Sequence, residues 1–307
     1  MRSASQMRLA SALILLVAAN LFWAGQGVAV KLLDGKLDPL AIALLPFYCI
    51  TAIGLCILAG KRSFIPRCAL AWRFRGEFLL AGICGQFLAQ VGMTLGVSWS
   101  LASNGAILSL MIPILSALIA TWLLGERLTT LRVCSLLLGI AGVILLSPLP
   151  HFNASGATMH PLAGNLFITA GCLGSAFYNV YSKRLLDRFS DLEILFFSYL
   201  ATAVVGLPML VLFAPHCLLE LTRFRASNWG AFGYLAIILY GVSMAFFLSA
   251  LRKVDAIVAS ASLYLVPLFG VVMAFAILKE HLLPQAVVGS VVVLLATWML
   301  FQFDYVV

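Results

Sequence analysis

Long apolar stretches follow one another along the whole chain, and the polar residues gather in short segments between them. Within each stretch the apolar residues run on continuously and do not alternate with polar ones. A helix needs about 20 apolar residues to cross the hydrocarbon core of a membrane, and it pairs its backbone groups within the segment. The pattern therefore predicts membrane-spanning helices. We expect ten of them, at Leu9–Val30, Pro39–Ala59, Gly76–Ser98, Leu101–Leu124, Leu131–Ser147, Leu162–Ser182, Leu192–Phe213, Trp229–Leu251, Ala256–Leu278 and Pro284–Phe303.

The composition agrees with a protein that lies mostly within a membrane. Of the 307 residues, 63% are hydrophobic and 10% are charged, whereas a soluble domain has about 25% charged residues. The Arg-bearing start and the apolar run after it also resemble a signal peptide. That run continues to Val30, which is too long for the hydrophobic region of a typical signal, so we expect an uncleaved first span.

The chain carries a formal net charge of +8, and its distribution is informative. Fourteen of the nineteen Lys and Arg residues lie at the termini or in the even-numbered loops between spans, and five lie on the other side. Because positively charged loops stay in the cytoplasm, this distribution predicts that both termini are cytoplasmic. The charge thus indicates orientation and does not point to nucleic acid as a partner.

The second half of the chain repeats the first. When the sequence is shifted by 154 residues, Pro113 falls on Pro267 and Glu126 falls on Glu280. Each copy holds five predicted spans, and because five is odd, the copies cross the membrane in opposite directions. Inverted repeats recur in secondary transporters, although a duplication without a transport role would leave the same pattern. We divide the chain into a cytoplasmic N-terminus (1–8), a first repeat (9–147), an external linker (148–161), a second repeat (162–303) and a cytoplasmic C-terminus (304–307).

Motifs in both halves resemble the EamA family of the drug/metabolite transporter superfamily. Each half has a proline-bearing span that ends in a glutamate motif, LGERL at 124–128 and LKEHL at 278–282, and the first span carries LFWAG at 21–25. The resemblance implies a multi-pass exporter or permease of the bacterial inner membrane, with ten transmembrane helices in two inverted five-helix repeats around a central cavity. The copies differ from each other at Ser135, which stands where Gly289 stands in the second half.

The eleven acidic residues and the four histidines all lie in loops or at the ends of predicted spans. A charged group deep in the bilayer usually marks a proton relay or an ion path, so we expect facilitated diffusion, exchange, or coupling through the substrate's own charge. The chain has no nucleotide-binding loop, nucleophile elbow or metal-ligand cluster, and its seven cysteines show no Cys-x-x-Cys spacing. We predict that the protein is not an enzyme and that it has no cofactor or metal.

Neutral polar and aromatic residues within the spans are the candidates for lining a binding cavity. Gln86 and Gln90 are four residues apart and share one face of the third span. Aromatic faces supply contact area and amides orient polar groups, so such a lining suits a neutral, zwitterionic or aromatic metabolite. The same groups also join helices to one another, cap them or anchor them at the interface. The candidates are Trp23, Gln26, Gln86, Gln90, Asn104, Tyr178, Asn179, Tyr240, Ser243 and Tyr264.

Two pairs of matched residues are candidates for hinge and gate positions. Pro113 and Pro267 fall mid-span, where a proline kinks a helix and acts either as a hinge or as a static bend. Glu126 and Glu280 follow the C-terminal ends of their spans, where the helix dipole disfavours an anion. We expect the N-terminal amides of the next helix along the chain to compensate each glutamate, which is a structural role. A gating or coupling role is the alternative.

These features together predict a secondary transporter, an exporter or permease of small neutral, zwitterionic or aromatic metabolites such as amino acids, working by alternating access. A lipid or lipid-carrier flippase is the alternative, and a non-transporting membrane scaffold or sensor is the alternative from another class. The expected partners are a small-molecule substrate and the lipid bilayer. A GxxxG pattern at Gly92 and Gly96 fits close helix contact within the protein or across a dimer, so we expect a monomer or a homodimer.

Overall fold

The structure is a computed structural model, and it describes residues 2–99, 108–146, 161–278 and 284–303. Every regular element within these residues is helical, which confirms the predicted all-α class. The first half comprises α1 (Arg2–Ala24), α2 (Gln26–Leu33), α3 (Pro39–Ala59), α4 (Phe64–Arg73), α5 (Arg75–Leu80), the π-helix η1 (Ala81–Phe87), α6 (Leu88–Trp99), α8 (Met111–Leu124) and α9 (Thr130–Leu146). The second half comprises α10 (Pro161–Leu185), α11 (Asp191–Phe213), α12 (Cys217–Thr222), α13 (Ala226–Gly233), the π-helix η2 (Tyr234–Ser243), α14 (Met244–Leu251), α15 (Ala256–Ala261), the 3-10 helix η3 (Ser262–Tyr264), α16 (Leu265–Leu278) and α17 (Pro284–Phe303).

The helices follow the predicted spans closely. The first predicted span is divided into α1 and α2 at Gly25, and three other spans run through an irregular segment, as α5–η1–α6, α13–η2–α14 and α15–η3–α16. Residues 101–107 of the predicted fourth span lie outside the described residues. Within the described residues, five helical segments are long and apolar enough to cross a membrane: Leu9–Val30, Pro39–Ala59, Arg75–Gly96, Asp191–Phe213 and Ala226–Leu251. Shorter apolar helices are Met111–Leu124, Thr130–Leu145, Ala256–Gly270 and Val287–Leu300.

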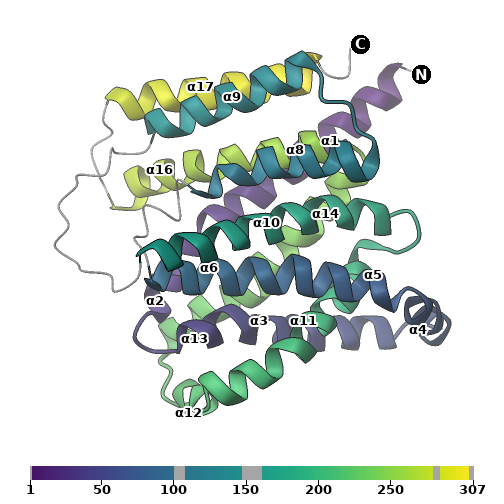
Figure 1. The fold of residues 1–307 in the computed structure, drawn as a ribbon, viewed down its shortest axis with the longest axis vertical. Coiled ribbons are helices and arrows are strands. Elements are labelled where there is room, and N and C mark those ends of the chain that lie inside the picture. The colour runs from purple at the N-terminus through teal and green to yellow at the C-terminus, as the bar shows by residue number, and fades with distance from the viewer. Residues whose placement is uncertain (1, 100–107, 147–160, 279–283, 304–307) are drawn as a thin grey trace.

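Equivalent helices of the two halves run in opposite directions. Lys253 donates to the Ser11 hydroxyl near the start of α1 (3.0 Å), and Lys183, near the end of α10, donates to the carbonyl of Val254 (2.9 Å). The start of α1 and the end of its counterpart α10 therefore lie on the same side of the molecule. That side, where α1 begins and α17 ends (Figure 1), is called the basic side below.

The two halves interlock along matched pairs of helices. α10 packs against η1 and α6, and its counterpart α1 packs against η2 and α14, while α3 packs on α11 and α9 on α17 (Figure 1). Glycines allow the closest of these contacts, because a Cβ atom at Gly92 would lie 2.8 Å from the backbone nitrogen of Gly171. At Gly96 it would lie 2.6 Å from the backbone nitrogen of Ile168. The GxxxG pattern thus serves a contact between α6 and α10 within the chain.

The irregular segments also occur at matched positions. The π-helices η1 and η2 lie in the third span of each half, offset by about the length of the repeat. Pro267 lies three residues after the end of η3, and Pro113 lies three residues after a turn at Leu110. Because proline has no N–H, the carbonyl four residues earlier loses its helical partner and the last turn before the proline changes its winding. Each bend therefore precedes its proline, which itself lies in the first turn of α8 or α16, while the proposed hinge role stays a prediction.

Candidate substrate-binding region and gate

Three buried tyrosines lie between the halves and form what we call the tyrosine cluster: Tyr178 on α10, Tyr199 on α11 and Tyr240 on η2. The Tyr199 hydroxyl donates to the backbone carbonyl of Tyr240 (3.1 Å), and the Phe47 ring lies 4.8 Å from Tyr199 and 4.7 Å from Tyr240, centroid to centroid. The hydroxyls of Tyr178 and Ser198 are 3.1 Å apart. The hydrogen bonds therefore join helices of the second half, and the Phe47 ring contacts the cluster from the first half.

The predicted glutamine pair reaches this cluster from the third span. Gln90 on α6 accepts a hydrogen bond from the Tyr240 hydroxyl (2.9 Å), and Gln86 on η1 is buried beside the Tyr178 hydroxyl. Gln86 and Tyr240 occupy equivalent positions of the two π-helices, since they are 154 residues apart. The structure thus brings together Gln86, Gln90, Tyr178 and Tyr240 among the predicted site residues.

Asn179 has the most suggestive surroundings of the predicted residues. It is 6% exposed, and no hydrogen bond of its amide is found in the described part of the chain. It precedes Lys183 by four residues, so the two side chains lie on one face of α10 with Asn179 one turn deeper in the bundle. Because the residue keeps a small exposed area, its amide can bind water or a ligand.

A polar group that sequence reasoning missed lies between α1 and η3. The Asn20 amide nitrogen donates to the Leu16 carbonyl (2.8 Å) and to the Ser262 hydroxyl (2.9 Å), while its oxygen is buried without a partner among the described residues. The buried hydroxyl of Tyr264, a predicted site residue on η3, likewise has no partner among these residues. An asparagine within the apolar run of the first span was the signal available for this group.

The remaining predicted residues are more dispersed. The Trp23 ring lies 5.4 Å from that of Phe247, and Ser243 is fully buried and donates to the carbonyl of Ala19 (3.0 Å). Both contacts join α1 to the third span of the other half. Gln26 is half-buried at the start of α2. Asn104 lies outside the described residues, and the substrate roles of all four stay predictions.

On the basic side, a charged cluster ties the two halves together. Glu126, just after α8, accepts the backbone N–H groups of Ala256 (2.7 Å) and Ile257 (3.0 Å) at the start of α15, and it pairs with Lys183 of α10 (2.9 Å). Lys183 lies 3.4 Å from Asp255, which also pairs with Arg132 of α9. We call these four charged residues, Glu126, Arg132, Lys183 and Asp255, the Lys183 cluster.

The partner of Glu126 differs from the expected one. We expected the amides of the next helix along the chain, α9, but Glu126 caps α15, which belongs to the other half. Gly125 has a φ of 70°, which glycine adopts without strain, and it turns the chain at the end of α8. Because α8 packs against α15, the glutamate reaches that N-terminus, where the helix dipole favours an anion. The corresponding Glu280 lies outside the described residues.

The Lys183 cluster holds the Asp255 carboxylate in the charged form. Burial by itself would raise the pKa of Asp255, but the hydrogen bond from Arg132 and the positive charge of Lys183 outweigh it, and the pKa is lowered from its ordinary value of 3.8. The Glu126 side chain is only 7% exposed, so its two backbone donors and Lys183 replace the water it has lost. Asp255 is therefore charged throughout the physiological pH range.

Helices arranged as interlocking inverted halves, with neutral polar side chains buried between them and a charged contact closing one side, define a multi-pass membrane transporter. The sequence pattern of the EamA-like transporter family matches residues 10–147 and 162–302. The chain belongs to this family, which confirms the suspected resemblance. It is a membrane transporter of a small molecule and not an enzyme.

Named relatives and a solved structure agree with this assignment. YetK of Bacillus subtilis, an uncharacterized transporter, is 26% identical over 66% of this chain, and the match spans 60% of YetK, less than two thirds of it. A Streptantibioticus cattleyicolor protein named "Probable terminal-alkyne amino-acid exporter" is 25% identical over 92% of this chain and 91% of its own. The S-adenosylmethionine uptake transporter of Rickettsia prowazekii is 23% identical over 69% of this chain and 67% of its own length. A crystal structure has the same fold, with a TM-score of 0.73 and 19% identity over 94% of this chain and 96% of its own.

Proposed function

We propose that this transporter carries small neutral, zwitterionic or aromatic metabolites such as amino acids, and that it works by alternating access through a central cavity. The observation that carries the proposal is the neutral polar lining between the halves, above all the buried Asn179 amide that has no protein partner in the described part of the chain. The nine acidic residues that the structure describes all lie at helix ends or in loops. Amide and tyrosine hydroxyl groups suit a neutral or zwitterionic cargo, because they offer both donors and acceptors without a net charge.

The same lining argues for uniport or exchange. The described spans hold no carboxylate in their interior, so they offer no carboxylate that could carry protons across the membrane. Export is the direction we propose, because the relative that matches over more of its own length is named an exporter. The inner membrane of a bacterium is the location that fits such an exporter.

The Lys183 cluster supports the alternating-access step. It connects α8 and α9 of the first half with α10 and α15 of the second, on the basic side, which we assign to the cytoplasm. The side chain of Asn179 lies one turn deeper than Lys183. Separating Glu126 from the α15 amides would open a path to that amide, so the Lys183 cluster acts as the cytoplasmic gate and is closed in this structure.

Counterflow in proteoliposomes is the direct test, because it requires no assumption about coupling. Vesicles loaded with one unlabelled neutral or zwitterionic amino acid at a time are diluted into the labelled compound, with protein-free vesicles as the control. We expect transient accumulation of at least one such metabolite, insensitive to a protonophore. No counterflow of any metabolite, together with scrambling of a fluorescent phospholipid, would replace this proposal with the flippase alternative.

A further inference from the structure

A short helix on the basic side exposes an apolar strip. Helix α4 joins α3 to α5 and is seen nearly end-on in Figure 1, so its axis runs across the direction of the spans. Ile65 is 79% exposed and Trp72 is 70% exposed, and the exposed Ala69 lies between them. Residues at this spacing share one face of a helix. Helix α4 therefore has the form of a helix that lies in the membrane interface.

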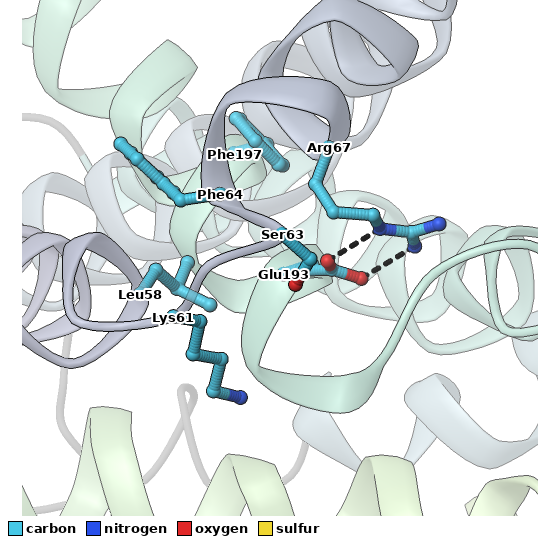
Figure 2. Close-up of a pocket in the computed structure, with 7 residues that line it drawn as sticks. All are labelled: Leu58, Lys61, Ser63, Phe64, Arg67, Glu193 and Phe197. Atoms are coloured by element: carbon cyan, nitrogen blue, oxygen red, sulfur yellow. Dashed lines mark hydrogen bonds and ion pairs between the residues drawn. The ribbon is translucent and has the colours of Figure 1, made fainter.

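The opposite face of α4 is fixed to the protein. Arg67 pairs with both carboxylate oxygens of Glu193 on α11 at 2.6 Å (Figure 2), and the Phe64 ring packs 6.5 Å from that of Phe196. The cavity between α4 and α11 measures about 10 Å³, room for one water molecule at most. Any ligand of α4 must therefore bind on its outer face.

Cations without partners border the apolar strip. Lys61, Arg62 and Arg73 are exposed, and none of them forms an ion pair within the described residues. Figure 2 shows the Lys61 ammonium group pointing away from the Glu193 carboxylate, which Arg67 already occupies. Three uncompensated positive charges thus lie beside two large apolar side chains.

The neighbouring spans show what covers this surface. On α3 the side chain of Ile57 is half-exposed, and on α5 those of Leu79 and Leu80 are too. Lipid tails are the natural partner of such side chains on membrane spans. The strip on α4 continues this apolar surface at the level where the spans end, which is the level of the lipid headgroups.

We propose that α4 and its flanking residues form a binding site for anionic phospholipids of the cytoplasmic leaflet. Lys61, Arg62 and Arg73 take the phosphate groups, while Ile65 and Trp72 enter the boundary between headgroups and acyl chains. A basic amphipathic helix that follows a span directly suits anionic lipid, since each cation near such a surface contributes about 1 kcal/mol.

Lipid retention by the full-length protein in a neutral detergent tests the proposal. Purified protein is titrated with phosphatidylglycerol or phosphatidylcholine, and bound lipid is counted by native mass spectrometry. The variant K61Q/R62Q/R73Q should bind phosphatidylglycerol at least roughly tenfold more weakly, given about 1 kcal/mol for each cation. The matched control K36Q/R223Q/R225Q removes three exposed cations from the opposite side, and it should bind phosphatidylglycerol as the wild type does.

A second measurement addresses the apolar half of the site without depending on those variants. Wild type and W72F are reconstituted with phosphatidylcholine brominated near the top of the acyl chains, and the difference in their fluorescence isolates Trp72. We expect that difference to be strongly quenched. The proposal would be overturned if the protein bound both lipids equally well, if both triple variants lost the same amount of phosphatidylglycerol binding, or if Trp72 were not quenched. An acidic soluble protein would then be the remaining candidate to cover the strip.

Discussion

At the scale of single residues, two buried asparagines have different roles although they look alike in the sequence. Asn20 holds α1 to η3 through its hydrogen bond to the Ser262 hydroxyl, whereas Asn179 forms no hydrogen bond in the described part of the chain. Their burial is similar, so the free energy of unfolding and transport should respond in opposite ways to the same substitution at the two positions.

Replacing Asn179 with Leu should leave thermal stability unchanged or higher, because no protein hydrogen bond is lost. Counterflow should fall by roughly tenfold or more if the amide binds the substrate, since a lost hydrogen bond of that kind is about 1–3 kcal/mol. Asn20→Leu is the control, and it should lower the unfolding temperature because the Ser262 hydroxyl loses its donor. Undiminished counterflow in Asn179→Leu would exclude Asn179 from the substrate site.

The carboxylates on the basic side predict how stability depends on pH. Burial would raise the pKa of Asp255, but the hydrogen bond from Arg132 and the charge of Lys183 lower it below its ordinary value of 3.8. A carboxylate whose pKa is lower in the folded state stabilises the protein above its unfolded pKa, and this stabilisation is lost as the pH falls through the folded pKa. The unfolding temperature in detergent should therefore be level from pH 8 to about 5 and fall below about 4. Asp255→Asn should reduce that fall, and an unchanged slope would contradict the assignment.

At the scale of helices, glycines decide how closely the halves approach. A Cβ atom at Gly171 would lie 2.7 Å from the backbone nitrogen of Met93, so Gly171→Ala forces α10 away from α6. We expect a loss of roughly 1–3 kcal/mol of stability, as in other overpacked interiors, measured by thermal unfolding in detergent. Gly230→Ala on α13 is the control, because nothing lies within 4 Å of the added atom. Equal effects of both changes would mean that the α6–α10 contact is loose.

The cap that Glu126 places on α15 predicts how the gate opens. Glu126→Gln removes the charge from two backbone hydrogen bonds and from the pair with Lys183, a loss of about 1.5–3 kcal/mol. The population open on the basic side should rise by roughly tenfold. In an Asn179→Cys background without native cysteines, an impermeant thiol reagent should then label position 179 faster from that side. Asp187 is an exposed acid on the same side, and Asp187→Asn should leave the labelling rate unchanged. Equal labelling rates in the parent protein, in Glu126→Gln and in Asp187→Asn would contradict the proposed gate.

At the scale of the whole molecule, the charge distribution predicts one orientation. Single cysteines at position 36 and position 127, in a background without native cysteines, should be labelled from opposite sides of intact cells. Position 36 should react from outside and position 127 only after permeabilisation, because basic segments stay in the cytoplasm. The reverse pattern would place the Lys183 cluster outside and reverse the proposed direction of the gate.

The spans were predictable from sequence because they follow from the length of the apolar runs. The opposite orientation of the halves was predictable because each half holds an odd number of spans. The all-α class and the family are confirmed, and the GxxxG contact lies within the chain. The partner of Glu126 was not predictable, because a helix N-terminus from the other half reaches it only through tertiary packing. Asn20 was missed because a single polar residue in an apolar run does not indicate which residue it will bind in the folded protein. The π-helices have no local sequence signature either, and only the repeat marks them as matched.

The Lys183 cluster has a further consequence when the repeat is applied to its members. Moved by the length of the repeat into the other half, Lys183 falls on Val30, Asp255 on Leu101 and Arg132 on Ala286, and none of these three residues is charged, although Lys31 follows Val30. A gate built on the matched positions of the other face would keep the glutamate but have neither the second acid nor a cation at these positions. The contacts that hold the two faces closed would therefore differ in strength. With the basic side assigned to the cytoplasm, the empty carrier should spend most of its cycle closed toward the cytoplasm and open to the outside. An exporter of this design would be limited by the return of its empty form, and a counter-substrate taken up from outside would speed it.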